Sequence, residues 1–299
     1  MATIRSGFVG VLGRTNVGKS SFINAILGRK LLIVSNKHQS TRNRIRCIYN
    51  ESDVQIVFID TPGLHKPVDK LSNYLIKQAF GALADLDLVL YMVEPWGEIP
   101  AYDQEMIKRM RSLASPKFLL INKSDTAKGN AVAETIQTYG ELDVFNEIVP
   151  ISCVDGTNLL RSIELIKAYL PEGPRYFPEE ASTDRPETFV IAEFVREAVY
   201  RHTRQEVPYS TYVEIVEVNE RQDGSLLAIY ATIYVARRSQ KGILIGDRGE
   251  MIKRIGQEAR QLIETLLGTQ VYLDLHVKVA DKWNEDEAHI ARSLGASST

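Results

Sequence analysis

An octapeptide near the N-terminus, Gly13–Ser20, constrains this chain more than any other feature. Its sequence, GRTNVGKS, fits the pattern G-x-x-x-x-G-K-[ST]. The apolar run 8–12 precedes it, and residues 21–27 follow it with the apolar spacing of a helix. A glycine-rich loop between a strand and a helix directs backbone N–H groups and the positive helix N-terminus at phosphate oxygens. The pattern therefore predicts a site for the phosphates of a nucleotide.

Each residue type in this loop has an expected role. Gly13 and Gly18 let the backbone curl, Lys19 adds a positive charge, and Ser20 is a ligand for Mg²⁺. A chance glycine-rich turn is the alternative, and the setting between a strand and a helix makes it rare. The residues expected to contact the nucleotide here are Gly13, Arg14, Thr15, Asn16, Val17, Gly18, Lys19, Ser20 and Ser21.

The first 170 residues or so alternate apolar runs with helical patterns. Four further apolar runs, each short enough for a strand, are residues 54–59, 86–93, 118–121 and 148–151. Near-continuous apolar strands separated by helices indicate an α/β fold, with a mostly parallel sheet and helices on both faces. In such sheets ligands bind at the carboxyl ends of the strands.

Polar motifs stand at three of these strand ends. Asp60 is expected to hold a water of Mg²⁺, and the N–H of Gly63 to reach the γ-phosphate. The carboxylate of Asp125, in the motif Asn122-Lys123-Ser124-Asp125, can accept hydrogen bonds from guanine N1–H and its exocyclic amine. Adenine does not present these donors, so the motif favours GTP over ATP. The backbone N–H groups of Ser152 and Cys153 are expected to donate to guanine O6.

A polar stretch between Ile33 and Arg44 lacks periodicity and precedes a strand, which is typical of a mobile switch. Thr41 is the first candidate for the second hydroxyl on Mg²⁺. Ser40 competes with it, and Ser35 is a more distant third.

Residues 173–187 are rich in proline and polar residues, and we place a linker there, between domains at 1–172 and 188–299. The second domain is predicted to be α+β, with a glycine-containing loop between its second strand and second helix. Its expected elements are a helix at 188–204, strands at 209–219 and 225–237, a helix at 250–267, a strand at 270–279 and a short C-terminal helix.

Charge is unevenly distributed along the chain, although the net charge is only −2. Residues 1–50 contain nine Lys or Arg and no Asp or Glu, which favours an anionic ligand there. From residue 181 onward 15 basic residues face 18 acidic ones, so overall charge does not predict RNA binding. Locally, however, a cluster of basic residues forms a patch that could hold RNA phosphates. Its members are Arg237, Arg238, Lys241, Arg248, Lys253, Arg254 and Arg260.

Together these motifs resemble the Era family, Ras-like GTPases of bacterial ribosome assembly, over nearly the whole chain. The matching residues are Gly13-Arg14, Asn16–Ser20, Gln39, Thr41-Arg42, Asp60–His65, Asn122-Lys123 and Asp125. The resemblance implies hydrolysis of GTP to GDP with Mg²⁺ and a C-terminal type II KH domain. It further implies binding of the 3′ end of 16S rRNA rather than DNA, and a role in assembly of the small ribosomal subunit. We expect a cytoplasmic chain, because the N-terminus has no secretory apolar region and the two cysteines form no CxxC pair. We also expect a monomer.

The resemblance also names a catalytic set: Asn16, Lys19, Thr41 and Gly63. Leu64 stands where Ras-like enzymes carry a glutamine that orients water, so hydrolysis is expected to rely on Lys19, Mg²⁺ and the loop amides and to be slow. In related GTPases with this substitution, an asparagine equivalent to Asn16 helps to bind K⁺, which we carry over as a hypothesis. Thr15 replaces the usual proline and Cys153 the usual alanine; both act through backbone atoms, so binding is expected to survive.

The G-x-x-G motif of the KH resemblance opens the helix at 250–267 and is expected to clamp RNA phosphates while bases lie across an apolar groove. Asp247 departs from the family, because a carboxylate in a phosphate clamp repels RNA unless it points to solvent. The residues expected to bind RNA are Lys241, Gly242, Ile245, Gly246, Asp247, Arg248, Gly249 and Lys253.

Two other functions fit parts of the sequence. One is an RNA-binding module that binds GTP without hydrolysing it, which Leu64 favours; the other is an ATP-dependent nucleotide kinase, against which Asn122 and Asp125 argue. Peripheral attachment to the inner membrane is a minor alternative, because no basic amphipathic helix strongly supports it.

Overall fold

The computed structural model describes residues 4–37, 40–42, 45–61, 86–220, 226–281, 283–285 and 290. The chain forms two compact units that meet in sequence between Asp184 and Arg185, and residues 31–37 and Ser40 belong to the second unit. The expected linker is thus divided, since its residues 173–184 are part of unit 1. No helix in the described ranges is long and apolar enough to cross a membrane.

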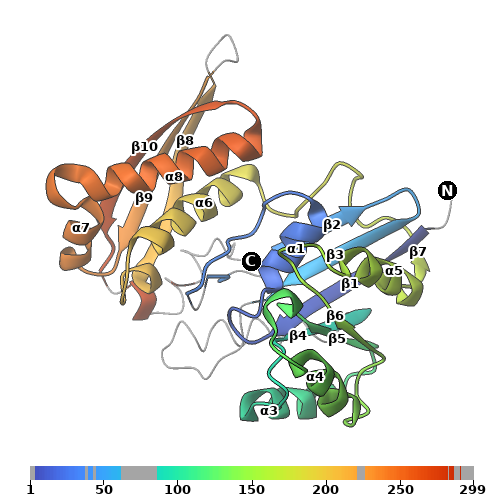
Figure 1. The fold of residues 1–299 in the computed structure, drawn as a ribbon. Helices are drawn as coiled ribbons and strands as arrows, with labels where there is room; N and C mark the ends of the chain where they lie inside the picture. Colours follow the sequence, from blue (N-terminus) through green and yellow to red (C-terminus); the bar gives the residue numbers. More distant parts are fainter. Residues whose placement is uncertain are drawn as a thin grey trace. The chain divides into compact units, whose positions relative to one another are not determined.

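Unit 1 is built on a sheet with the strand order β2-β3-β1-β4-β5-β6, to which β7 is added beside β1 (Figure 1). Strands β1, β3, β4, β5 and β6 run parallel, whereas β2 and β7 run antiparallel to β3 and β1. This is the mostly parallel sheet that the apolar runs predict. The strands are β1 (Ile4–Gly13), β2 (Ile45–Asn50), β3 (Val54–Asp60), β4 (Leu88–Val93), β5 (Lys117–Ile121), β6 (Glu147–Pro150) and β7 (Glu172–Gly173).

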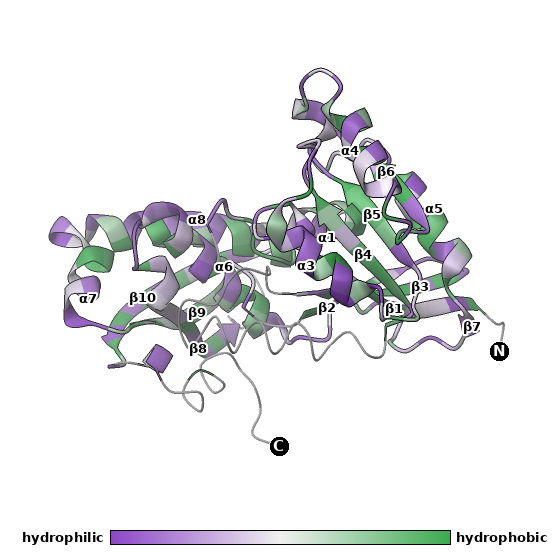
Figure 2. Ribbon diagram, turned by 90° about the horizontal axis from the view of Figure 1, so that it is seen from below, coloured by the Kyte–Doolittle hydropathy of each residue, from purple (hydrophilic) through white to green (hydrophobic). Residues whose placement is uncertain are grey.

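Helices cover both faces of this sheet, so β3, β4 and β5 are buried along their whole length and are mostly apolar (Figure 2). Neighbouring strand residues face opposite layers: Leu119 packs in one cluster with residues of α3 and α4, whereas the Phe118 ring meets Tyr169 of α5 edge to face. The helices are α1 (Lys19–Leu27), α3 (Ala101–Met110), α4 (Ala131–Gly140) and α5 (Leu159–Tyr169).

The segment after β7 is fastened to unit 1 rather than free. The buried Gln55 side chain of β3 accepts hydrogen bonds from the N–H groups of Tyr176 (2.7 Å) and Phe177 (3.0 Å) and donates to the Phe177 carbonyl (2.8 Å). Further along, the Ile48 N–H of β2 donates to the carbonyl of Ser182 at 2.9 Å. Proline and glycine thus mark a change of direction here, not a flexible tether.

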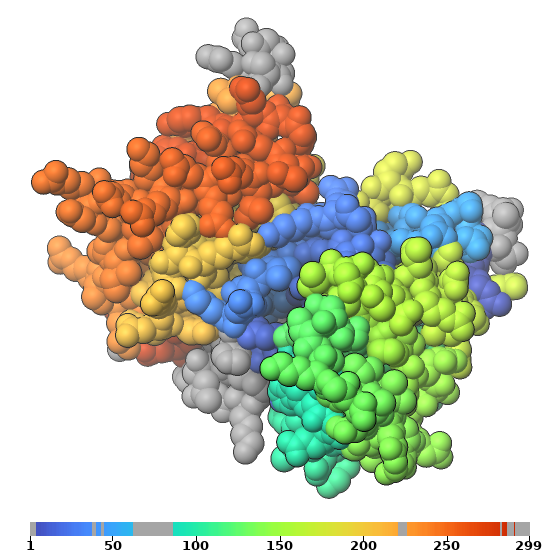
Figure 3. All heavy atoms as spheres, in the orientation of Figure 1, coloured from blue at the N-terminus to red at the C-terminus, as the bar shows by residue number. Residues whose placement is uncertain are grey.

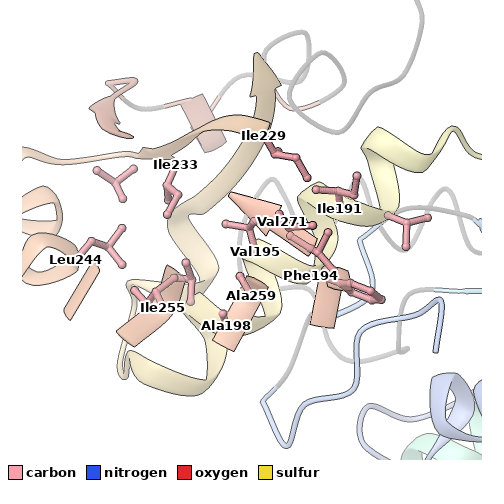
Figure 4. Packing of buried hydrophobic residues seen from close by; sticks show 14 of the residues in the cluster. Ile191, Phe194, Val195, Ala198, Ile229, Ile233, Leu244, Ile255, Ala259 and Val271 are labelled. Carbon is pink, nitrogen blue, oxygen red and sulfur yellow. The ribbon is translucent and has the colours of Figure 1, made fainter. Parts of the chain in front are cut away.

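Within its described residues, unit 2 packs three α-helices on a three-stranded sheet of order β10-β9-β8, in which β9 is antiparallel to β8 and parallel to β10. Figure 4 shows side chains from α6, α7, α8, β9 and β10 converging in its apolar core, among them Phe194, Ile233 and Ile255. The elements are α6 (Glu187–His202), β8 (Thr211–Glu220), β9 (Leu226–Val235), α7 (Arg238–Ile245), α8 (Glu250–Leu267) and β10 (Gln270–Val279).

One prediction in unit 2 is wrong: the expected glycine-containing loop after β9 begins with a helix, α7. Its one-turn-apart residues Gln240 and Leu244 are both buried, and that spacing outweighs the low helix propensity of Gly242. The element order is therefore helix-strand-strand-helix-helix-strand. The predicted C-terminal helix lies almost entirely outside the described residues.

Candidate functional site

The phosphate loop connects the carboxyl end of β1 to the N-terminus of α1, as its sequence predicts. Gly18 has φ +107°, and a Cβ at this position would lie 2.1 Å from Nδ2 of Asn122, so glycine is required both for conformation and for space. Asn16 is exposed with φ +66°. The remaining predicted loop residues Thr15, Val17 and Ser21 lie on the loop and on the first turn of α1.

Lys19 lies under the loop and is only 6% exposed. Its Nζ donates to the carbonyls of Gly13 (3.1 Å) and Arg14 (2.8 Å). Burial lowers the pKa of Lys19 to about 8, and the nearby Asp60 carboxylate opposes that shift. A phosphate anion that binds in the loop would stabilise the charged form of this buried ammonium group, so the interaction between them is favourable.

Ser20, Thr41 and Asp60 converge from α1, the predicted switch and β3. The Oδ2 of Asp60 accepts hydrogen bonds from Ser20 Oγ (2.9 Å) and Thr41 Oγ1 (3.1 Å), and the two hydroxyl oxygens are 3.1 Å apart. Asp60 is fully buried, and its Oδ1 has no hydrogen-bond partner among the described residues. Burial raises the pKa of Asp60, whereas Lys19 and the two hydroxyls lower it.

These oxygens fit Mg²⁺, which takes one or two carboxylates together with hydroxyls, waters and substrate phosphates. The Oδ1 of Asp60 is the buried acceptor that a cation or its water would satisfy. No cluster of three or more His, Cys, Asp or Glu side chains suited to a metal occurs in the described ranges. The candidate metal site is therefore one carboxylate and two hydroxyls beside the phosphate loop.

Of the three hydroxyl candidates in the switch, Thr41 is the one placed beside Asp60. Ser40 instead offers its carbonyl to Arg196, and the Ser35 hydroxyl accepts from the N–H of Lys37 at 3.1 Å. Gly63, predicted to meet the γ-phosphate, and Leu64 lie outside the described residues.

The guanine motif follows β5, and Asn122 joins it to two other segments. Its Nδ2 donates to the carbonyl of Val17 (2.8 Å), and its Oδ1 accepts from the N–H of Cys153 (3.2 Å). Lys123 has φ +64°, and its ammonium group pairs with Glu94. Asp125 is exposed on the short helix Ser124–Thr126, where its carboxylate is accessible to a base.

The loop after β6 differs from its prediction in one respect, because both expected donors are engaged within the chain. The N–H of Ser152 donates to the Thr157 carbonyl at 3.1 Å, and that of Cys153 to Asn122. The Ser152 hydroxyl accepts from the N–H groups of Val154 (3.2 Å) and Asp155 (3.3 Å) and holds the turn. Donation to guanine O6 therefore requires a shared hydrogen bond or an exchange of partners.

Sequence reasoning missed the segment after β4. Glu94 pairs with Lys123, and the Trp96 ring lies under the Arg14 guanidinium group, 4.0 Å from its carbon to the ring centroid. The signal was available, since Glu94 follows a strand of the parallel sheet just as Asp60 and Asn122 do.

In unit 2 the G-x-x-G turn is Gly246–Gly249, between α7 and α8. Gly246 has φ +74°, and a Cβ there would lie 2.7 Å from the Cβ of Met251; Gly249 has φ +82°. Gly242, also expected in this loop, lies inside α7 instead. Asp247 and Arg248 are exposed, which fits the alternative that the Asp247 carboxylate points to solvent. Lys241 and Ile245 are half-buried on α7, and Lys253 is exposed on α8.

A groove of about 390 Å³ runs between α8 and β10 beside this turn. In Figure 3, α7 and α8, in orange, form much of the visible surface of unit 2. The groove is lined by both apolar and cationic side chains, a combination suited to the bases and phosphates of a single strand. The lining residues are Ile252, Lys253, Gly256, Gln257, Arg260, Tyr272, Leu273 and Leu275.

Comparisons with known proteins agree with both sites. Residues 8–123 match the family model of the 50S ribosome-binding GTPases, and residues 206–284 match that of the KH domain. The chain is 49% identical to the GTPase Era of Geobacter metallireducens over 97% of both chains. It is 47% identical to that of Thermotoga maritima over 98% of both.

Two solved structures are similar over 98% of this chain and 99% of theirs. One is Era in complex with MgGDPNP and nucleotides 1506–1542 of 16S ribosomal RNA, at 35% identity and a TM-score of 0.91. The other is a tyrosine-to-alanine variant of Aquifex aeolicus Era bound to GDP·AlF4⁻, at 36% identity and a TM-score of 0.92. With a phosphate loop, a guanine motif and a KH domain in the same order, this chain belongs to the Era family of GTPases.

Proposed function

We propose that this chain hydrolyses GTP to GDP in unit 1 and binds the 3′ end of 16S rRNA through unit 2, as a switch in assembly of the small ribosomal subunit. The observation that carries the proposal is the convergence of Ser20, Thr41 and the buried Asp60 beside the phosphate loop. We further propose that it works in the cytoplasm as a monomer.

The chain's own groups supply most of the catalysis. Lys19 and the loop N–H groups stabilise negative charge that develops on the β- and γ-phosphate oxygens, and desolvation makes that contact strong. Asp60, Ser20 and Thr41 hold Mg²⁺, which neutralises the same oxygens when bound. Leu64 has no group that could orient the attacking water, so we expect slow intrinsic hydrolysis.

Base selection rests on Asp125, whose exposed carboxylate is presented by a motif held through Asn122. Two hydrogen bonds from guanine N1–H and its amine satisfy that carboxylate, whereas adenine leaves it without donors. Losing a charged hydrogen bond costs about 1.5–3 kcal/mol, which is enough to favour GTP over ATP by at least tenfold.

RNA binding is supported by the α8–β10 groove with its cationic side chains, and by the similar structure of Era in complex with nucleotides of 16S ribosomal RNA. The glycines of the turn at Gly246–Gly249 leave room for a sugar-phosphate backbone, and the exposed Lys253 and Arg260 can pair with phosphates.

Coupling between the two activities is supported by the predicted switch. Within unit 2, the Lys37 ammonium group donates to the carbonyls of Tyr200 and Thr203 at the end of α6, and Arg196 of α6 donates to the Ser40 carbonyl. Ser40 is followed directly by Thr41, whose hydroxyl lies beside Asp60. A γ-phosphate that draws Thr41 onto Mg²⁺ thereby pulls on a segment that is fastened to α6.

Phosphate release from GTP and from ATP tests the catalytic part. We compare the wild-type chain with Lys19→Ala and with Lys108→Ala, which removes an exposed lysine of α3. The wild type and Lys108→Ala should release phosphate from GTP but not ATP, and Lys19→Ala should release none. GTP binding without any phosphate release would instead support the RNA-binding module, and equal use of ATP would exclude selection by Asp125.

A further inference from the structure

The side chain of Arg14 is engaged by two residues outside the phosphate loop, Asp103 and Trp96. Its Nε lies 3.7 Å from Oδ2 of Asp103 on α3, and its guanidinium carbon lies 4.0 Å from the centroid of the Trp96 ring. The Arg14 side chain is only 22% exposed. An arginine in the phosphate loop is thus held by groups outside that loop.

Asp103 can hold this arginine in place, because its carboxylate is buried and is itself oriented by residues of two other elements. It is 1% exposed. The hydroxyl of Tyr91 on β4 donates to its Oδ1 at 2.7 Å, and that of Tyr139 on α4 donates to its Oδ2 at 3.3 Å. A carboxylate in such surroundings is costly unless a cation faces it, and Arg14 is a cation that does.

Asp103 and Trp96 together form a clamp on the Arg14 side chain, and the loop that carries Trp96 is fixed as well. Gly97, next to Trp96, donates its N–H to Thr135 Oγ1 (2.9 Å) and accepts from Thr138 Oγ1 (2.8 Å), so the loop after β4 is tied to α4. Arg14 is therefore held between a fixed ring and a fixed carboxylate. The attraction of the guanidinium group to the indole ring adds to that of the ion pair.

The backbone of Arg14 takes part in the phosphate site, since its carbonyl accepts from Lys19 Nζ at 2.8 Å. Holding the side chain therefore limits how far this stretch of the loop can turn. Preorganised N–H groups bind an anion without a further loss of entropy on ordering.

We propose that Asp103 is a positioning residue for guanine-nucleotide binding, acting through Arg14 to hold the phosphate loop in its binding conformation. The inference rests on the proposed function only in taking GTP and GDP as the ligands. The clamp contributes equally to binding of the substrate and of the transition state. Its loss should therefore weaken GTP and GDP binding about tenfold and raise KM, while kcat stays nearly unchanged.

A double-mutant cycle in the full-length chain tests this. We measure the Kd of fluorescent mant-GDP, the KM and kcat for GTP, and Tm for Asp103→Asn, Arg14→Met and the double variant. Arg14→Met keeps most of the side-chain volume and removes the charge. Glu105→Gln is the matched control, because it makes the same kind of change on α3 at a side chain that is 62% exposed.

We expect both single variants to lose affinity by a similar factor, and the double variant to lose no more than either. Glu105→Gln should bind like the wild type. Unchanged affinity in Arg14→Met overturns the proposal even if Asp103→Asn fails to fold. A lowered Tm with wild-type affinity, or an undiminished effect of Asp103→Asn in the Arg14→Met background, overturns it too. Failure of the wild type to bind mant-GDP would contradict the proposed function instead.

Discussion

Asn122 illustrates how much of the nucleotide site depends on single side chains. It is 3% exposed, and its amide bridges the phosphate loop at Val17 and the loop after β6 at Cys153. Both ends of its amide are used, so replacement by an aliphatic residue would leave the buried Val17 carbonyl and the partly buried Cys153 N–H unpaired. The guanine motif therefore joins two segments of the chain through Asn122, in addition to its expected role in base recognition.

Cys153 lies in the loop after β6, and its environment keeps it a thiol. Burial raises the pKa of Cys153 from 9.0 to about 12, reinforced by Asp125 and opposed by Asn122. The reactive form is the thiolate, and at pH 8 its population falls about 1000-fold for such a shift. The side chain should therefore be chemically silent in the folded protein.

We predict that iodoacetamide modifies Cys153 about 1000-fold more slowly in the folded chain than in the chain unfolded in urea, at pH 8. The rate in the folded chain should keep rising tenfold per pH unit above pH 9, where an ordinary cysteine levels off. Site-resolved mass spectrometry separates Cys153 from Cys47. Equal rates in the folded and unfolded chains would contradict the described environment.

At the scale of elements, helices and strands with a strong periodic pattern could be predicted from the sequence. Elements in which a local signal contradicts that pattern could not. The bounds of α8 and β10 agree with those expected from periodicity. The helix α7 was hidden by Gly242, because a residue of low helix propensity close to a real glycine turn looks like part of that turn. Asp60 was predictable from a strand end and Ser20 from the phosphate-loop motif, and Thr41 was the first of three candidates in the switch. The direction of Arg14 was not predictable, because it depends on Asp103, far away in sequence.

The attachment of residues 174–184 was not predictable either, because it depends on Gln55, a polar residue near the start of the buried strand β3. We predict that Gln55→Leu lowers the free energy of unfolding by about 3 kcal/mol, since it leaves the N–H groups of Tyr176 and Phe177 and the Phe177 carbonyl unpaired. Chemical denaturation measures this loss.

The same change should expose the bond after Arg175 to trypsin, because the attachment that orders this segment is gone. The matched control is Gln137→Leu, which replaces an exposed glutamine on α4 and should alter neither stability nor cleavage. Unaltered trypsin cleavage in Gln55→Leu would mean that other contacts, such as those of Arg175 with Glu51 and Ser52, suffice.

At the scale of the whole molecule, the chain combines two compact units with separate cores and separate candidate ligands. One stretch of chain serves both: residues 33–37 and Ser40 belong to unit 2, and Thr41 belongs to the candidate metal site of unit 1. We therefore expect a ligand that moves Thr41 to alter the contacts that Lys37 and Ser40 make with α6. Linkage requires that RNA on unit 2 changes nucleotide affinity by the same factor.

The affinity of the full-length chain for a labelled single-stranded fragment of the 16S rRNA 3′ end, measured by fluorescence anisotropy with GDPNP·Mg²⁺ and with GDP·Mg²⁺, tests this coupling most directly. We predict tighter binding with GDPNP, by about fivefold or more, and weaker binding in both states for Lys253→Glu. Equal affinities in the two nucleotide states would contradict the coupling.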